Sequence, residues 1–332
     1  MSSESLNRIA FKRIISNKLS FYSLIVIIFF ILIASFASII SPDKTPMANN
    51  MNLELATLPP FSKVDYLIIL PSNSKIPIQD FVIKDDIIHY SLYRAREIEE
   101  YRGEFKIITQ TFFFGTDKYG RDLLSRIIYG SRVSLSVGFI AVLISLILGV
   151  SLGLIAGYFR GFIDDIIMLI INVVWSIPTL LMVISITLAL GKGFWQIFIA
   201  VGLTMWVEVA RIVRGQVLGV RELEFVEAGK ALAYKPYRII FKHILPNIIG
   251  PIIVISAANF ASAILLEAGL SFLGIGVQPP IPSWGTMIRD HYAFIVMNKA
   301  YLAFLPGLAI MFLVLAFMLL GNGLRDAFDV KK

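Results

Sequence analysis

Long runs without a charged residue dominate this chain, and short polar segments separate them. A membrane-spanning helix needs roughly 20 consecutive, mostly apolar residues to cross the hydrocarbon core of a bilayer. Five runs satisfy that requirement, namely 19–42, 133–159, 166–191, 244–266 and 300–324. We therefore predict a membrane-spanning helix from each of these runs.

A sixth apolar segment, at about 193–210, is shorter because Glu208 interrupts it. Without a crossing here, the two loops that flank it would lie on sides of the membrane that their charges exclude. We therefore count it as a span. The expected fold is an all-α polytopic membrane protein with six transmembrane helices, in which Pro178, Pro246 and Pro251 shape kinks.

The composition supports this class and excludes several others. Hydrophobic residues make up 57% of the chain and charged residues only 16%, too few to cover a water-soluble core of this kind. The chain has no cysteine, which rules out disulfides, thiol catalysis and thiolate metal sites. Its histidines, at positions 89, 243 and 291, are too scattered to suggest a clustered metal site.

The distribution of basic residues predicts the orientation. Arg8, Lys12, Arg13 and Lys18 precede the first span with only Glu4 opposing them, and cytoplasmic segments of membrane proteins are enriched in Lys and Arg. Both termini are then cytoplasmic, as is the basic segment 211–243. The net charge of +7 is explained by this bias, so we expect no nucleic-acid partner.

The segment between the first two spans is expected to lie outside the cytoplasm and to be rich in β-structure. Short apolar runs such as VDYLIIL and EFKIITQTFFF alternate there with Pro, Asn, Ser and Gly, a pattern typical of small strands. The predicted organisation is a cytoplasmic N-terminus with the first helix (1–42), an extracytoplasmic insertion (43–112) and a five-helix core (113–332). The insertion is either a structural spacer or a lip that helps to receive a soluble partner.

A charged, helix-forming segment, EAGKALAYKPYRIIFKHILPN (227–247), stands between two long apolar runs. Acidic residues come first and Lys230 and Lys235 last, as the dipole of a short helix favours. Pro236 ends that helix and suits the first turn of another, so a rigid elbow is expected.

This segment resembles the EAA loop of the permease subunits of ABC importers, placed here at about 211–246. The resemblance implies that it docks into an ATP-hydrolysing subunit, and the residues expected to do so are Glu224, Glu227, Ala228, Gly229, Leu232, Ala233, Leu245 and Pro246. The family usually has Gly where this chain has Ala233, and Ala where it has Gly229. In the left-handed conformation Ala233 costs roughly 1 kcal/mol.

Further motifs resemble the second, C-type membrane subunit of dipeptide and oligopeptide permeases. They are FGTDKYGRDLLSRIIYGSRVSL (114–135), EAGLSFLGIGVQPPIPSWGTM (267–287) and GNGLRD (321–326). The likeness covers about 113–329 and leaves out 50–112. We expect an amphipathic helix along the outer membrane surface after the signature residues Gly115, Thr116, Asp117, Gly120, Arg121 and Asp122.

No phosphate-binding loop G-x-x-x-x-G-K-[ST] occurs in the chain, so ATP and Mg are expected on a partner ATPase and no cofactor on this chain. The resemblance implies two nucleotide-binding subunits, a second permease subunit and an extracytoplasmic solute-binding protein, all at an inner or plasma membrane. Asn259 and Glu267 are candidates for the substrate path, or for bonds between helices.

The substrate expected from the resemblance is a dipeptide or oligopeptide. A nickel chelate or an antibacterial peptide on the same scaffold is the alternative. A stand-alone secondary transporter would need coupling charges within the spans, and few are available.

Overall fold

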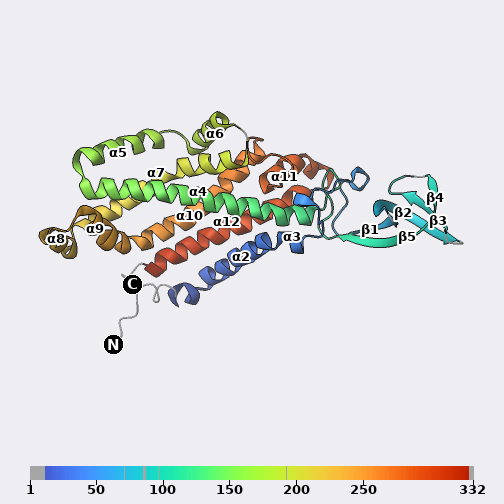
Figure 1. Cartoon of the computed structure of the whole chain (residues 1–332), viewed down its shortest axis with the longest axis horizontal. Coiled ribbons are helices and arrows are strands. Elements are labelled where there is room, and N and C mark those ends of the chain that lie inside the picture. Colours follow the sequence, from blue (N-terminus) through green and yellow to red (C-terminus); the bar gives the residue numbers. More distant parts are fainter. Residues whose placement is uncertain (1–11, 71, 85–86, 96, 192, 329–332) are drawn as a thin grey trace.

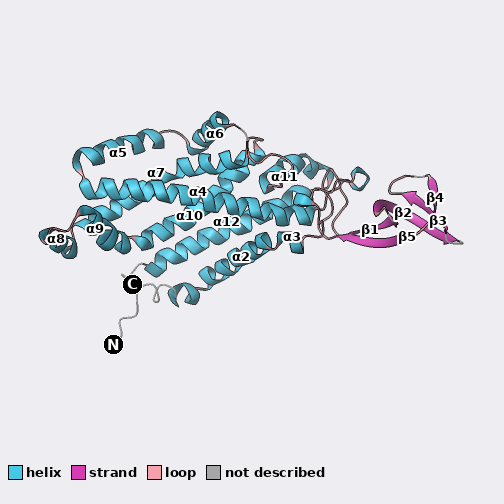
Figure 2. Cartoon of the chain, viewed as in Figure 1, coloured by secondary structure: helices cyan, strands magenta, loops and turns pink. Residues whose placement is uncertain are grey.

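The computed structural model describes residues 12–70, 72–84, 87–95, 97–191 and 193–328. It consists of a bundle of long helices with a small sheet standing off one end (Figures 1 and 2). The long helices are α2 (Lys18–Ser35), α4 (Leu123–Phe159), α7 (Phe194–Arg221), α10 (Ile249–Phe272) and α12 (Tyr301–Phe328). These five are long and apolar enough to cross a membrane.

The run 166–191 does not form one straight span. It is divided between α5 (Gly161–Trp175) and α6 (Thr179–Leu190), which are bent by 91° at the break before Thr179. Pro178 precedes α6 and cannot donate a backbone hydrogen bond across the break. The described residues therefore contain five spans, or six if α5 and α6 are counted as one broken crossing. The sixth apolar segment, at about 193–210, is interrupted in sequence by Glu208 but lies within the continuous helix α7.

The centre of the bundle is the contact between α4 and α7. Gly149, Gly153 and Gly157 recur at intervals of four on α4, and a Cβ atom added to any of them would lie 2.5–2.7 Å from a heavy atom of α7. Val209, Val213 and Val217 are the facing valines. Small residues at this spacing let two membrane helices approach closely. Larger side chains on this stripe would force α4 and α7 apart.

The insertion is rich in β-structure, as predicted, and the structure adds that its strands form a five-stranded antiparallel sheet in the order β4-β3-β2-β1-β5. Its strands are β1 (Ser62–Ile69), β2 (Ser74–Lys84), β3 (Ile87–Leu92), β4 (Ile98–Arg102) and β5 (Phe105–Phe112). We call these strands the sheet lobe. The lobe and the short helices α8 and α9 lie at opposite ends of the bundle (Figure 1).

Short elements connect the spans. On the side of the sheet lobe they are α3 (Ala37–Ile40), η1 (Pro46–Ala48), η2 (Leu53–Leu55), α11 (Trp284–His291) and η5 (Tyr292–Met297). At the opposite end they are α8 (Glu224–Ala231), α9 (Pro236–Ile239), η3 (Ile240–Ile244) and η4 (Leu245–Asn247).

The surface helix expected after the FGTD motif is not a separate element. Leu123 already begins α4, which continues without a break to Phe159. Asp122 caps it by accepting a hydrogen bond from the Ser125 amide at 2.8 Å. The charged residues in its first turns interrupt the apolar run without interrupting the helix. Arg126 lies 3.8 Å from Asp117 and donates to the Ala48 carbonyl at 3.4 Å.

Candidate coupling site

Residues 222–247, which we call the elbow, fold into α8 and then, after a tight turn, into the consecutive short elements α9, η3 and η4. Ala233 has a φ of 55°, the left-handed conformation expected at this position. Its N–H donates to the Lys230 carbonyl at 2.9 Å, and the N–H of Tyr234 donates to the Gly229 carbonyl at 3.0 Å. These two bonds form a Schellman motif, which ends α8 and satisfies carbonyls that a helix end leaves free. Pro236 then begins α9, as predicted.

Buried aliphatic side chains fasten the elbow to the bundle. Val226 of α8, Ile239 of α9 and Ile244 of η3 are at most 1% exposed. They pack in one cluster with Val213 and Val217 of α7. Because each short helix contributes to a shared core, the elbow is held to α7 as one body and does not hang as a loose loop.

The opposite side of the elbow faces solvent and carries most of the residues that the resemblance singled out. Exposed among them are Glu224, Glu227, Ala228, Leu232, Ala233 and Pro246. Gly229 is buried against the turn, and Leu245 is half-buried. Large apolar side chains are exposed on the same segment, with Leu232, Tyr237 and Phe241 each more than 60% exposed. An exposed surface with carboxylates and large apolar groups is suited to bind another protein.

The sequence analysis missed Tyr234, which organises the turn. Its ring stacks on that of His243, with centroids 6.0 Å apart and an interplanar angle of 16°. The guanidinium carbon of Arg238 lies 3.9 Å from the centroid of the same ring. Tyr234 thus connects α8, α9 and η3. A tyrosine directly after the expected left-handed residue was the only signal in the sequence.

Two ion pairs tie the neighbouring corner between α4 and α5 to α7 and the elbow. Arg214 of α7 donates to both carboxylate oxygens of Asp164 in α5, at 2.5 and 2.6 Å. Arg160, at the corner, lies 2.8 Å from the Glu222 carboxylate. The first pair is partly buried and bidentate, the stronger geometry, whereas the second is solvent-exposed and contributes little.

At the other end of the molecule, the FGTD signature is a buried structural junction. Asp117 is fully buried and lies 2.6 Å from Arg121 and 3.8 Å from Arg126. Arg121 also donates to the Asn49 side chain at 3.0 Å. His291 of α11 accepts the backbone N–H of Lys118 at 3.3 Å. The signature therefore joins α4, α11 and the segment that leads into the sheet lobe.

The two signature glycines explain how that segment, residues 45–61, is held. A Cβ atom on Gly115 would lie 2.2 Å from the Leu58 carbonyl oxygen, and one on Gly120 would lie 1.6 Å from that of Asn52. Both glycines have positive φ, at 76° and 73°. Thr116 donates its backbone N–H to Leu58 at 3.1 Å. Backbone contact at this distance leaves no room for a side chain at either glycine. Residues 45–61, which we call the stem of the sheet lobe, are therefore held against the bundle.

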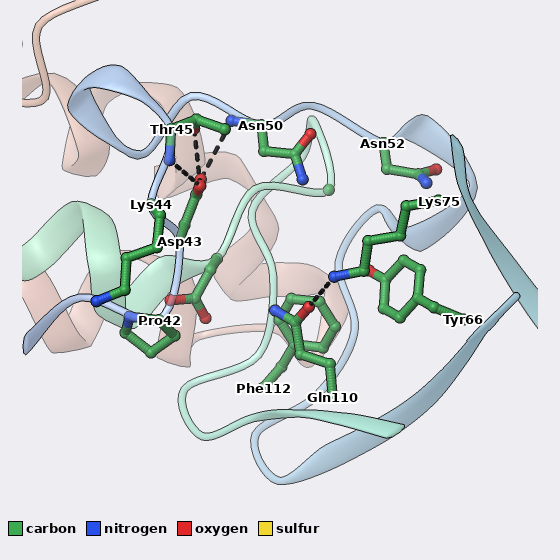
Figure 3. A pocket seen from close by; sticks show the side chains of 12 residues that line it. Pro42, Asp43, Lys44, Thr45, Asn50, Asn52, Tyr66, Lys75, Gln110 and Phe112 are labelled. Atoms are coloured by element: carbon green, nitrogen blue, oxygen red, sulfur yellow. Dashed lines mark hydrogen bonds between the residues drawn. The ribbon is translucent and has the colours of Figure 1, made fainter. Parts of the chain in front are cut away.

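A polar crevice lies between the stem and the sheet (Figure 3). Lys75 of β2 donates to Gln110 at 2.7 Å, and its ammonium lies 4.0 Å from the centroid of the Tyr66 ring. Burial lowers the pKa of Lys75, although Asp43 opposes this. Burial also raises the pKa of Asp122, against hydrogen bonds from Ser125 that lower it. Within the crevice, Asp43 accepts hydrogen bonds from Thr45 at 2.7 and 2.8 Å and from the Asn50 backbone N–H at 3.2 Å.

Neither residue proposed for a substrate path lines a cavity described in this structure. Glu267 is fully buried and accepts hydrogen bonds from Ser271 and Ser283, both at 2.7 Å, and from Ser134 at 3.4 Å. Asn259 is 1% exposed, and its side-chain nitrogen has no hydrogen-bond partner among the described residues. The serine network makes Glu267 a link between α4, α10 and the loop before α11.

Comparison with known proteins agrees with this architecture. A family described as "Binding-protein-dependent transport system inner membrane component" matches residues 149–332. The "N-terminal TM domain of oligopeptide transport permease C" matches residues 5–60. The likeness therefore also includes the N-terminal helix and reaches past residue 50, which corrects the narrower range that the motifs indicated. Residues 61–148 lie outside both matches.

Several transport proteins resemble the chain over most of their length. A dipeptide transport system permease protein of Bacillus subtilis is 45% identical over 219 residues, covering 66% of this chain and 68% of the relative. That of Lactococcus lactis is 34% identical over 300 residues, covering 90% and 80%. A glutathione transport system permease protein of Pectobacterium atrosepticum is 40% identical over 219 residues, covering 66% and 72%.

Among solved structures, a chain of the MetNI methionine ABC transporter in inward-facing conformations has a similar fold. The TM-score is 0.50 at 18% identity, covering 62% of this chain and 96% of the other. At this identity the likeness concerns the fold alone. The family matches and the relatives together establish that this multi-pass membrane chain belongs to the inner-membrane components of binding-protein-dependent transport systems.

Proposed function

We propose that this chain is one of two permease subunits of an ATP-driven importer of dipeptides or oligopeptides. In this proposal two ATPase subunits bind and hydrolyse ATP with Mg, and a solute-binding protein delivers the substrate on the other side of the membrane. Relatives named for dipeptide, oligopeptide and glutathione transport support a short peptide as substrate.

The observation that carries the proposal is the construction of the elbow. On its buried side, Val226 and Ile239 pack in one hydrophobic cluster with side chains of α7. On its exposed side, Glu227 and Leu232 are available to a partner. A partner that moves against this exposed side would displace α7 with it. Because the Schellman turn fixes the angle between α8 and α9, little of the displacement would be absorbed locally.

The orientation of the chain in the membrane follows from the charge of the segment that contains the elbow. The segment 211–243 carries seven Lys and Arg residues against three Asp and Glu residues, which favours a cytoplasmic location. The sheet lobe, at the opposite end, then faces the side from which a binding protein would arrive. Six crossings, with α5 and α6 as one broken span, would place both termini in the cytoplasm.

The direct test is to purify the tagged chain in mild detergent and identify the subunits that accompany it. The complex is then reconstituted in liposomes with the binding protein, and uptake of a labelled dipeptide is measured with and without ATP. We expect an ATPase and a second permease in the complex, and uptake only with ATP. Recovery of the chain with no ATPase would overturn the proposal.

A further inference from the structure

Helix α7 carries two exposed charges near the inner end of its apolar stretch, Glu208 within that stretch and Arg211 at the start of the basic segment 211–243. It is the most buried of the candidate spans, and from Ala200 to Ala210 Glu208 is the one exposed residue. Arg211 follows one turn later and is also exposed. Residues three apart lie on the same face of a helix, so the two charges share one narrow face of α7.

The carboxylate of Glu208 has no hydrogen bond or ion pair within the described part of the chain. The guanidinium carbon of Arg211 lies 4.0 Å from the centroid of the Trp175 ring. Such a contact leaves the guanidinium N–H groups free to donate in the plane of the group. Charged side chains within membrane spans face a water-filled cavity or a protein partner, because hydrocarbon cannot solvate them.

The same face continues as an open stripe toward the elbow. Gly215 and Gly219 follow Arg211 at intervals of four, and a Cβ atom added to either would have no neighbour within 4 Å. Beside them, Gln216 lines a hollow between α7, α10 and α12, to which Arg325 also contributes. From Glu208 to Gly219 this face of α7 is therefore uncovered. It carries two charges at one end and lies beside a hollow of mainly apolar lining at the other, to which Gln216 and Arg325 add polar groups.

We propose that Glu208 and Arg211 form a binding site for the charged ends of a zwitterionic substrate. Glu208 holds the ammonium group of the peptide N-terminus, and Arg211 holds the terminal carboxylate. This inference rests on the proposed function and assigns the substrate contacts within it. The opposite signs of the two side chains match the two ends of an unblocked peptide, and a charged end withdrawn from water without a partner would carry a high cost in free energy.

The first experiment asks whether this face is in water. The chain has no cysteine, so Glu208→Cys introduces a single thiol. The assembled complex in nanodiscs is treated with a charged, lipid-insoluble thiosulfonate, with and without a saturating dipeptide. Leu143→Cys, at an exposed apolar position of α4, is the matched control for a lipid-facing site.

We expect modification at position 208 at least tenfold faster than at position 143, and slowed several-fold by the dipeptide. Equal and slow modification at both positions would overturn the proposal, because it would place Glu208 against lipid or inside a closed interface. This arm reports on the site without requiring transport.

The second experiment identifies which end each charge holds. Uptake of a free dipeptide, its N-acetyl form and its C-terminal amide is measured for the wild type, Glu208→Gln and Arg211→Gln. Asp165→Asn removes an exposed carboxylate of α5 as a control. For the free dipeptide we expect Glu208→Gln to raise KM about tenfold while changing kcat less than twofold, and to abolish the preference over the N-acetyl form. Arg211→Gln should abolish the preference over the amide.

Equal losses for all three substrates would contradict the assignment, as would a Glu208→Gln chain that no longer assembles with the second permease, since Glu208 would then pair with that subunit. A wild-type complex that takes up none of these peptides would instead contradict the proposed peptide substrate. The failure of the site and the failure of the proposed function are therefore distinguishable.

Discussion

The N–H of Tyr234 donates to the carbonyl of Gly229 at 3.0 Å, across a turn in which Ala233 adopts a φ of 55°. Alanine disfavours that conformation, so the surrounding contacts must hold it there. The Tyr234 ring, with His243 and Arg238 on it, and the buried Val226 and Ile239 provide those contacts. The angle between α8 and α9 is thus determined by packing as well as by the backbone.

Gly229→Ala is expected to stabilise the elbow by up to about 1 kcal/mol, because glycine is a poorer helix former than alanine. The site has room for the methyl group, whose nearest neighbours would be Tyr234 at 3.6 Å and Ile239 at 3.7 Å. The measurement is the thermal midpoint of the purified complex. Gly149→Ala is the contrasting control and should destabilise, because its Cβ would lie 2.5 Å from Val209. A lower midpoint for Gly229→Ala would show that the turn needs glycine.

The bidentate pair between Asp164 and Arg214 is expected to hold α5 to α7. Asp164→Asn should cost about 1–2 kcal/mol, reduced from the value of a fully buried charged hydrogen bond because Arg214 is partly exposed. Asp165→Asn, on the exposed side of α5, should cost much less. A double-mutant cycle on thermal midpoints with Arg214→Gln measures the coupling, and a coupling energy near zero would mean that apolar contacts alone join the helices.

His291 should make the end that bears the lobe sensitive to acid. Burial lowers the pKa of His291 below its usual 6.5, so the neutral ring is favoured in the folded state. Neutral His291 accepts the Lys118 N–H at Nε2, and Nδ1 then donates to the Met287 carbonyl at 2.7 Å. Its contribution to stability is present above pH 6.5 and is lost as the pH falls through the lowered value.

The thermal midpoint of the wild type should therefore fall relative to that of His291→Gln as the pH is reduced from 7.5 to 5. Taking the difference between the two proteins removes the contribution of groups common to both, such as Asp122. A difference that does not change with pH would contradict this assignment.

Shortening the sheet lobe separates its two possible roles. Leu67 lies opposite Ile107 in the ladder, so replacing residues 68–106 with Asn-Gly closes a hairpin and keeps the buried Tyr66 and Phe112. The stem, which the signature glycines hold, is untouched. If the lobe tunes partner docking, assembly and basal ATP hydrolysis should persist while stimulation by the binding protein falls several-fold. Loss of the assembled complex would identify the lobe as a brace.

Much of the fold could be predicted because lipid imposes a strong pattern on sequence. Apolar runs marked the spans, and alternating short runs marked the sheet. Charge-free length was a poor guide to helix ends, however. α4 begins at Leu123, ten residues before its apolar run, because Arg126 lies near Asp117 and Arg132 donates to the Ala34 carbonyl at 2.6 Å. The 91° bend before Thr179 leaves no mark on hydropathy, since both of its arms are apolar.

The structure of the elbow could be predicted at positions where residue type determines the backbone conformation. It could not be predicted where side-chain packing determines it. Pro236 and Ala233 are positions whose conformation follows from residue type and spacing. The role of Tyr234 depends on contacts with residues on two other elements, which no local pattern reveals. The sequence left two roles for Glu267, lining the substrate path or bonding two helices. Only the positions of Ser134 and Ser283, which come from distant segments, place it in a closed hydrogen-bond network.

The central claim is that the exposed side of the elbow transmits the ATPase's motion, and Glu227→Lys tests it most directly. Glu104→Lys, an exposed carboxylate on the sheet lobe, is the matched control. ATPase retention on the tagged chain and ATP-dependent uptake are measured for both. Glu227→Lys should insert normally, retain the ATPase at least tenfold less and abolish uptake, whereas Glu104→Lys should retain the ATPase fully. Wild-type ATPase binding and uptake by Glu227→Lys would contradict the account.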